Sequence, residues 1–373
     1  MSSPTLHRAT IPANVVHSSR NPVGHGALLI YVMAIVYASL NPFFGWRAPE
    51  SFGLIVWPRY HSAFDIALNV LSYIPLGGML AAVRMREAGR KHSIAVVIGG
   101  VTLAGFGLSF IMESLQTMLP VRVASPVDLI ANTLGALIGA SLLTTHWGRA
   151  ALARTIAWRH RHFATGDESS WGLVLLGAWF VAQLNPLIPY FEAGRIANPA
   201  DLAAPPMSPP YDLLVLLPQT VGIALNVCGF ALFLSLLLRA EKRAMPGVLL
   251  IVTLGFITKI SVASLMLKAP QLAAWLGPAT IIGLSAGLLI FACFSRIGYR
   301  WRAFCATLFI FAGGLMAKMS SIYGAFDETL RLFNWPHGHL TSFAGLTRWL
   351  HETWPLLAFL LAAWIFVRHR QTQ

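Results

Sequence analysis

The sequence predicts an all-α protein, a polytopic transmembrane helical bundle, and two observations lead to that fold class. Apolar residues make up 56% of the 373-residue chain and charged residues only 11%, whereas soluble domains usually carry about 25% charged residues. The apolar residues also gather into segments close to the roughly 20 residues that a helix needs to cross a bilayer. Since this composition cannot make a soluble surface, we expect a multi-pass membrane protein.

About ten segments have the length and apolar character of a membrane span. They are residues 26–45, 64–83, 94–115, 126–145, 171–190, 212–238, 246–267, 271–294, 303–322 and 353–368. The first 25 residues are polar and contain no apolar stretch followed by a small-residue cleavage site, so we expect no removable signal peptide.

The basic residues predict the orientation of these spans. The formal net charge of +13 would suit nucleic-acid binding, but the basic residues fall in short runs between apolar segments and form no continuous face. Cytoplasmic loops of membrane proteins are enriched in Lys and Arg. The richer set is Arg8, Arg20, Arg84, Arg86, Arg90, Lys91, Arg149, Arg154, Arg159, Arg161, Arg239, Lys242, Arg243, Arg296, Arg300, Arg302, Arg368 and Arg370. The opposite loops hold only Arg47, Arg59, Arg122, Arg195, Lys268, Arg331 and Arg348. We therefore expect both termini in the cytoplasm (N-in/C-in) and no nucleic-acid partner.

The chain divides into four parts on this basis. Residues 1–25 form a cytoplasmic segment, 26–150 a four-span domain, 151–170 a basic cytoplasmic linker, and 171–373 a six-span domain. Leu40-Asn41-Pro42 recurs as Leu184-Asn185-Pro186, so the second domain can be read as a degenerate repeat of the first. Chance matches between apolar sequences explain the similarity equally well, and both interpretations stay open.

Strongly polar side chains surround the turn between the third and fourth spans and the start of the second. In the predicted orientation all of them lie at the extracytoplasmic end of the membrane, where buried charge indicates function. The set consists of Asp65, Asn69, Glu113, Gln116, Arg122, Asp128 and Asn132.

From Glu113 to Gly139 the sequence reads E-x-x-Q-x5-R-x5-D-x3-N-x2-G-x3-G, preceded by Asn69-Val-Leu-Ser-Tyr-Ile-Pro75-Leu-Gly77. This pattern resembles the VanZ family of bacterial membrane proteins over roughly the first 150 residues. The resemblance implies the bacterial inner (cytoplasmic) membrane and a cell-envelope role, including reduced susceptibility to the glycopeptide teicoplanin. The residues that match the family motif, and that the resemblance therefore marks as important, are Asn69, Pro75, Gly77, Glu113, Gln116, Arg122, Asp128, Asn132, Gly135 and Gly139. Asp65 fits the polar residue that the family has at the start of the second span. The six additional spans depart from compact family members.

Several of these residues also have a structural interpretation. Ser125-Pro126-Val127-Asp128 is a capping box with proline at the first helical position, so Asp128 is either a cap or a ligand contact. Glu113 lies near a helix C-terminus, where the dipole disfavours negative charge, and no cap explains it. Arg122 is the nearest guanidinium for pairing with a carboxylate.

Inside the spans, we expect the remaining motif residues to serve helix packing. Interhelical hydrogen bonds suit Asn69 and Asn132, and close helix approach suits Gly135 and Gly139. Pro75 and Gly77 predict a kink in the second span. Lys259 lies so deep in its span that it must be paired or line a wet cavity.

Three functions remain open. The first is a non-enzymatic envelope protein whose outer polar pocket binds an amphiphile, such as a lipid-linked glycan or a lipophilic glycopeptide, among membrane lipids. The second is a membrane enzyme with Glu113 as general acid or base. The third is a small-solute transporter. No phosphate loop, metal-ligand spacing or catalytic triad is present in the sequence, so we expect no cofactor and no metal.

Overall fold

The structure is a computed structural model, and most of the chain is described in it. The described residues are 22–41, 43–48, 63–88, 93–185, 188, 190–191, 213–239, 244–266, 276–319 and 339–369. Within these ranges the secondary structure consists of 11 helices and no strand, which confirms the all-α prediction. The predicted N-terminal cytoplasmic segment lies largely outside the described residues.

Ten helices overlap the expected spans and one does not. The helices are α1 (Pro22–Leu40), α2 (Ala63–Ala88), α3 (Ile94–Gln116), α4 (Pro126–Thr144), α5 (His146–His162), α6 (Asp167–Ala182), α7 (Leu213–Leu237), α8 (Ala244–Met266), α9 (Pro278–Phe294), α10 (Tyr299–Met319) and α12 (His339–Arg368). Six of them, α2, α3, α4, α7, α8 and α12, are long and apolar enough to cross a membrane, and α1 and α9 contain shorter apolar stretches. The protein is thus a multi-pass membrane protein.

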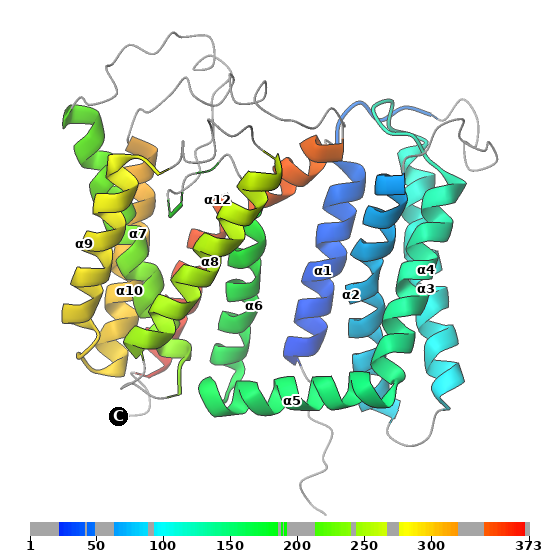
Figure 1. The fold of residues 1–373 in the computed structure, drawn as a ribbon, viewed down its shortest axis with the longest axis horizontal. Coiled ribbons are helices and arrows are strands. Elements are labelled where there is room, and N and C mark those ends of the chain that lie inside the picture. Colours follow the sequence, from blue (N-terminus) through cyan, green and yellow to red (C-terminus); the bar gives the residue numbers. More distant parts are fainter. Residues whose placement is uncertain are drawn as a thin grey trace, which may run out of the picture.

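The helices form two groups that α5 and α12 connect (Figure 1). Helices α1 to α4 make the first group, and α6 to α10 with α12 make the second. Helix α5 runs across one end of the molecule, where α4 ends and α6 begins (Figure 1). The upper part of α12 reaches α1, and the ring centroids of Tyr37 and Trp349 lie 6.1 Å apart.

Two helices differ from the expected boundaries. Residues 146–162 form α5, although most of them were expected in a linker. Helix α12 begins at His339, well before the expected span at 353, and continues through Pro355. An ion pair between Arg348 and Glu352, four residues apart, supports this added part, as does its contact with α1. The part of α12 before residue 353 therefore packs on the first group through Trp349.

Glycines allow α2 and α4 to approach closely. A Cβ atom at Gly135 would overlap the Val70 carbonyl oxygen, and one at Gly139 would overlap that of Ile74. Both helices start at the same end of the molecule (Figure 1), so these contacts and that of Gly77 with Ala136 fix a parallel register in which each α4 residue faces the α2 residue about 60 to 65 positions earlier. This register decides which polar groups share a layer at the outer end.

Candidate functional site

Glu113 lies in the last turn of α3, with 3% of its surface exposed. Its Oε2 atom accepts a hydrogen bond from the Ser125 backbone N–H at 2.9 Å. The Ser125 hydroxyl in turn accepts one from the Val127 backbone N–H at 3.1 Å. Glu113 therefore completes the cap of the following helix, α4.

We expected that Glu113 takes no part in helix capping, and this interpretation was wrong. In a capping box the side chain three residues after the cap, here Asp128, accepts from the N–H of the cap residue. In the structure, Glu113 from the preceding helix accepts that bond. The dipole at the start of α4 favours its negative charge, which offsets the unfavourable position at the end of α3.

Gln116 and Arg122 hold the C-terminal end of α1. The Gln116 side-chain amide donates to the Ser39 carbonyl at 3.0 Å. The Arg122 guanidinium donates to the Ala38 carbonyl at 2.8 Å and twice to the Asn41 carbonyl, at 2.8 and 3.0 Å. The last carbonyls of a helix lack partners within the helix, so these donors satisfy them and a cation there is favourable.

Arg122 therefore has a structural role that the sequence did not indicate. Burial lowers the pKa of its guanidinium from the ordinary value, but an arginine remains charged at neutral pH. Its pairing with a carboxylate stays a prediction.

A buried polar group lies one layer deeper. The Asn132 amide donates to the Ser109 hydroxyl at 3.0 Å, and Tyr73 lies beside Ser109. All three side chains are buried, with Ser109 completely inaccessible. The Asn132 Oδ1 atom is buried and has no hydrogen-bond partner among the described residues. An unsatisfied buried acceptor of this kind costs about 1–3 kcal/mol, so it indicates a missing donor.

Asp65, Asn69 and Asp128 complete the outer layer. Each side chain is half-buried, and the α2–α4 register places Asp65 near the level of Asp128 and Asn69 near the level of Asn132. Asp128 lies near enough to Glu113 for their charges to repel. Three carboxylates thus gather at the ends of α2, α3 and α4 that lie opposite α5 (Figure 1).

The motif residues inside the spans lie at the α2–α4 contact or opposite it. A Cβ atom at Gly77 would overlap the Ala136 carbonyl oxygen, so Gly77 faces α4. Pro75 lies within α2 with its side chain exposed, where lipid would contact it.

Tyr73 and Ser109 also belong to this site, although neither was predicted from the sequence. Ser109 could have been found, because it precedes Glu113 by four residues and therefore shares its helix face. Tyr73 gave no such signal, since its place depends on the packing of α2 against other helices. Within the described parts of the chain, no three His, Cys, Asp or Glu side chains are grouped as metal ligands.

The order of helices and the polar group just described can be compared with known families. Residues 12–147 match the model of the VanZ/LLP1 family. This match confirms the resemblance of the N-terminal region, which we call the VanZ-like region (residues 12–147). It contains α1 to α4 and ends as α5 begins, so every polar residue of the candidate site lies in it. No curated protein and no solved structure matches the chain.

Outside the VanZ-like region, the second group contains a buried cation. Lys259 of α8 is 1% exposed, and its Nζ atom donates to the Asn185 carbonyl at 2.9 Å. Nearby, Trp179, Phe191, Asn226, Ile310, His351 and Trp354 line most of a cavity of about 30 Å³. A space of that size holds only about one or two water molecules. The second group therefore has a polar interior of its own, distinct from the outer layer of carboxylates.

Proposed function

We propose that the protein is a non-enzymatic, VanZ-like protein of the bacterial inner membrane that binds an amphiphile at the outer end of its VanZ-like region. The ligand is of the type of a lipid-linked glycan or a lipophilic glycopeptide, and the binding groups are Asp65, Asn69, Asp128 and Asn132. Glu113, Gln116 and Arg122 hold the helix ends that carry them. This role belongs to envelope polysaccharide handling or to glycopeptide resistance.

The observation that carries the proposal is the gathering of three carboxylates around a buried acceptor in the outer layer. Glu113, Asp65 and Asp128 gather there, and the buried Asn132 Oδ1 lacks a donor among the described residues. Sugar hydroxyls and amines are donors that suit such a layer. The Arg122 guanidinium contacts α1 carbonyls, which favours a donor-rich ligand over a phosphate. Exposed leucines beside the layer, Leu68 and Leu71, would contact a lipid tail.

Binding is favoured over catalysis by the position of Glu113. A general acid or base must reach the proton that it transfers. Glu113 is 3% exposed and accepts the Ser125 N–H, so a substrate would have to displace a helix cap to reach it.

The site faces outward in a topology of ten spans with both termini in the cytoplasm. The described basic residues of the richer set lie in the last turns of α2, on α5, after α7, between α9 and α10, in the first turn of α10, and at the end of α12. In Figure 1 these positions share the end of the molecule that holds α5 and the C-terminus. Arg8, Arg20, Arg90, Lys91, Lys242, Arg243 and Arg370 lie outside the described residues, as do Arg59, Arg195, Lys268 and Arg331.

A degenerate repeat is supported by two equivalent contacts. Gly283 and Gly287 of α9 approach the Thr220 and Ala224 carbonyls of α7, as Gly135 and Gly139 of α4 approach α2. The asparagine of each recurring Leu-Asn-Pro sequence also accepts a hydrogen bond from a cation at its backbone carbonyl. Arg122 donates to Asn41, and Lys259 donates to Asn185. The carboxylates are found only in the VanZ-like copy of this arrangement.

Thiol labelling tests the orientation. Val123, in the α3–α4 loop, is 80% exposed, and Arg154 of α5 is also exposed. In a background without Cys293 and Cys305, we expect Val123→Cys to react with an impermeant thiol reagent in cells with a permeabilised outer membrane. Arg154→Cys should react only after the inner membrane is disrupted. The reverse pattern would place the carboxylates in the cytoplasm and refute an extracytoplasmic ligand.

Charge-neutral variants test the binding site. We expect Asp65→Asn and Asp128→Asn to weaken binding of teicoplanin to the protein in lipid nanodiscs about tenfold each, since hydrogen bonds to charged groups are worth about 1.5–3 kcal/mol. Glu113→Gln keeps an oxygen for the Ser125 N–H, and because Glu113 holds the frame and does not contact the ligand, affinity should stay near normal in this variant. Asp167→Asn, an exposed residue at the other end of the molecule, is the control.

The same titration with a polyprenyl-linked glycan distinguishes the two ligand types. If neither probe binds, or if Asp65→Asn and Asp128→Asn both bind as the unmodified protein does, the carboxylates serve helix packing alone and the proposed site is refuted.

A further inference from the structure

Helix α5 carries a basic and aromatic surface that the proposed ligand site does not use. Its sequence contains four arginines, three histidines and two tryptophans, and no acidic residue. None of its residues is buried. It lies across the molecule at the level where α4 ends and α6 begins (Figure 1), so in a membrane it lies along one surface of the bilayer.

The direction of α5 is fixed by contacts at both of its ends. Thr145 ends α4 and caps α5, accepting from the Gly148 N–H at 3.0 Å. Gly148 is required in this turn, because a Cβ atom there would overlap the Leu142 carbonyl oxygen. At the other end the Arg239 side chain donates to the His160 carbonyl at 2.7 Å. The helix is therefore held in place by the protein on both sides.

The two faces of α5 differ in composition. Gly148, Leu152, Ile156 and Arg159 form the inward row, which is half-buried, and Arg159 donates to the Ser170 hydroxyl of α6. The opposite row follows the helical repeat of three and four residues. It consists of Trp147, Arg154, Trp158 and Arg161, all of them exposed. We call this row the α5 stripe.

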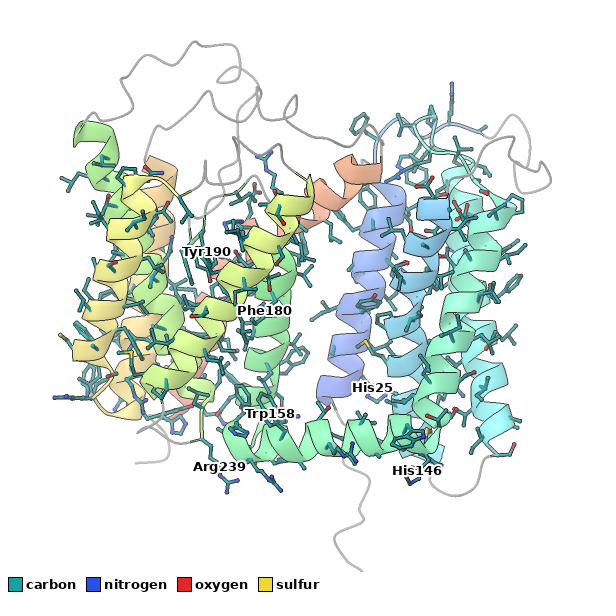
Figure 2. The ribbon with its side chains drawn as sticks, viewed as in Figure 1. His25, His146, Trp158, Phe180, Tyr190 and Arg239 are labelled. Carbon is teal, nitrogen blue, oxygen red and sulfur yellow. The ribbon has the colours of Figure 1, made fainter. Side chains whose placement is uncertain are left out.

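The α5 stripe has the composition that suits a phospholipid surface. Trp147 is 79% exposed and Trp158 is 53% exposed, and tryptophan favours the headgroup level of a bilayer. Figure 2 shows His146 and Trp158 toward opposite ends of the helix. Guanidinium groups bind phosphate oxygens through two parallel hydrogen bonds. Interfacial helices combine these features, and anionic lipids attract their basic residues.

We infer that the α5 stripe binds anionic phospholipid headgroups, with Arg154 and Arg161 on phosphates and Trp147 and Trp158 in the headgroup layer. Charge complementarity selects this occupant, since the stripe is basic and α5 runs across the end of the molecule where the apolar helices α4 and α6 end and begin. The proposed topology puts α5 at the cytoplasmic leaflet, whose surface is negative. The inference is independent of the outer ligand site.

Lipid co-purification tests this inference. The full chain is incubated in mixed micelles of equal phosphatidylglycerol and phosphatidylcholine, purified, and its bound lipids are counted by mass spectrometry. We expect phosphatidylglycerol to be enriched, and Arg154→Gln with Arg161→Gln to lower this enrichment by roughly fivefold per arginine. The control is Arg84→Gln with Arg86→Gln, which removes the same charge from exposed positions at the end of α2.

An unchanged ratio of the two lipids in the α5 variant, or an equal fall in the control, would overturn the inference. A second variant tests the same surface without changing its charge. Trp147→Phe with Trp158→Phe should lower the fraction of tryptophan emission that is quenched by phosphatidylglycerol brominated near the headgroup. If that fraction does not change, the stripe faces water or another macromolecule, and the lipid assignment is wrong.

Discussion

Replacing Gly139 with alanine should destabilise the VanZ-like region by roughly 3 kcal/mol, because a methyl group at this position meets backbone rather than a movable side chain. A Cβ atom there would overlap the Ile74 carbonyl oxygen and would lie 2.9 Å from the Gly78 nitrogen. Overpacking of a well-filled contact costs about 1–3 kcal/mol, and α2 and α4 must separate to relieve this one.

Thermal unfolding in detergent, followed by intrinsic fluorescence, measures the effect. Gly100→Ala is the matched control, because Gly100 lies inside α3 and a Cβ atom there meets nothing within 4 Å. Alanine is the better helix former by about 1 kcal/mol, so the control should be as stable as the unmodified protein or slightly more stable. Equal unfolding temperatures for the two variants would contradict the close α2–α4 contact.

The helices could be predicted because each span needs a length and an apolar composition that the sequence states directly. The expected segments 64–83 and 126–145 differ from α2 and α4 by only a few residues at most ends. Helix α5 was missed because its arginines indicated an exposed linker. A helix on a membrane surface can carry such charges on one side. The length and hydropathy of a segment do not distinguish such a helix from an exposed linker.

The polar residues could be placed at one end of the bundle from sequence, but their bonds could not. Glu113 accepts from Ser125 across a turn, and that choice over Asp128 depends on how α3 and α4 meet. Arg122 reaches Ala38 and Asn41, more than 80 residues earlier. Local periodicity contains no information about contacts over such separations. The spacing of Gly135 and Gly139 does indicate that α4 packs closely on another helix, but it does not show which helix that is.

These contacts divide the motif into residues that hold the helix ends and half-buried residues at the same end, which the proposed function assigns to the opening of a ligand site. Glu113, Gln116 and Arg122 satisfy backbone groups at helix ends. Asp65 and Asp128 are half-buried at the same level. A change in the frame should therefore be seen in stability, and a change at the opening should be seen in binding at normal stability.

Replacing Arg122 with glutamine should loosen the end of α1 and destabilise the protein by about 2–3 kcal/mol. Glutamine cannot supply the three hydrogen bonds that Arg122 gives to the Ala38 and Asn41 carbonyls. Hydrogen bonds from charged groups are worth about 1.5–3 kcal/mol each, and the total is reduced because this side chain is only half-buried. Arg122→Lys keeps the charge but loses the planar fork, so its effect should be intermediate.

Thermal unfolding gives the size of the effect, and hydrogen exchange gives its location. Backbone amides of residues 37–48 should exchange faster in Arg122→Gln, whereas those of α9 should not change. Arg47→Gln is the control, since Arg47 is exposed in the segment that follows α1 and its replacement removes the same charge. If the Arg47 and Arg122 variants unfold at the same temperature, the effect is one of net charge. The guanidinium would then not hold α1 in place, and the frame would depend on Glu113 and Gln116 alone.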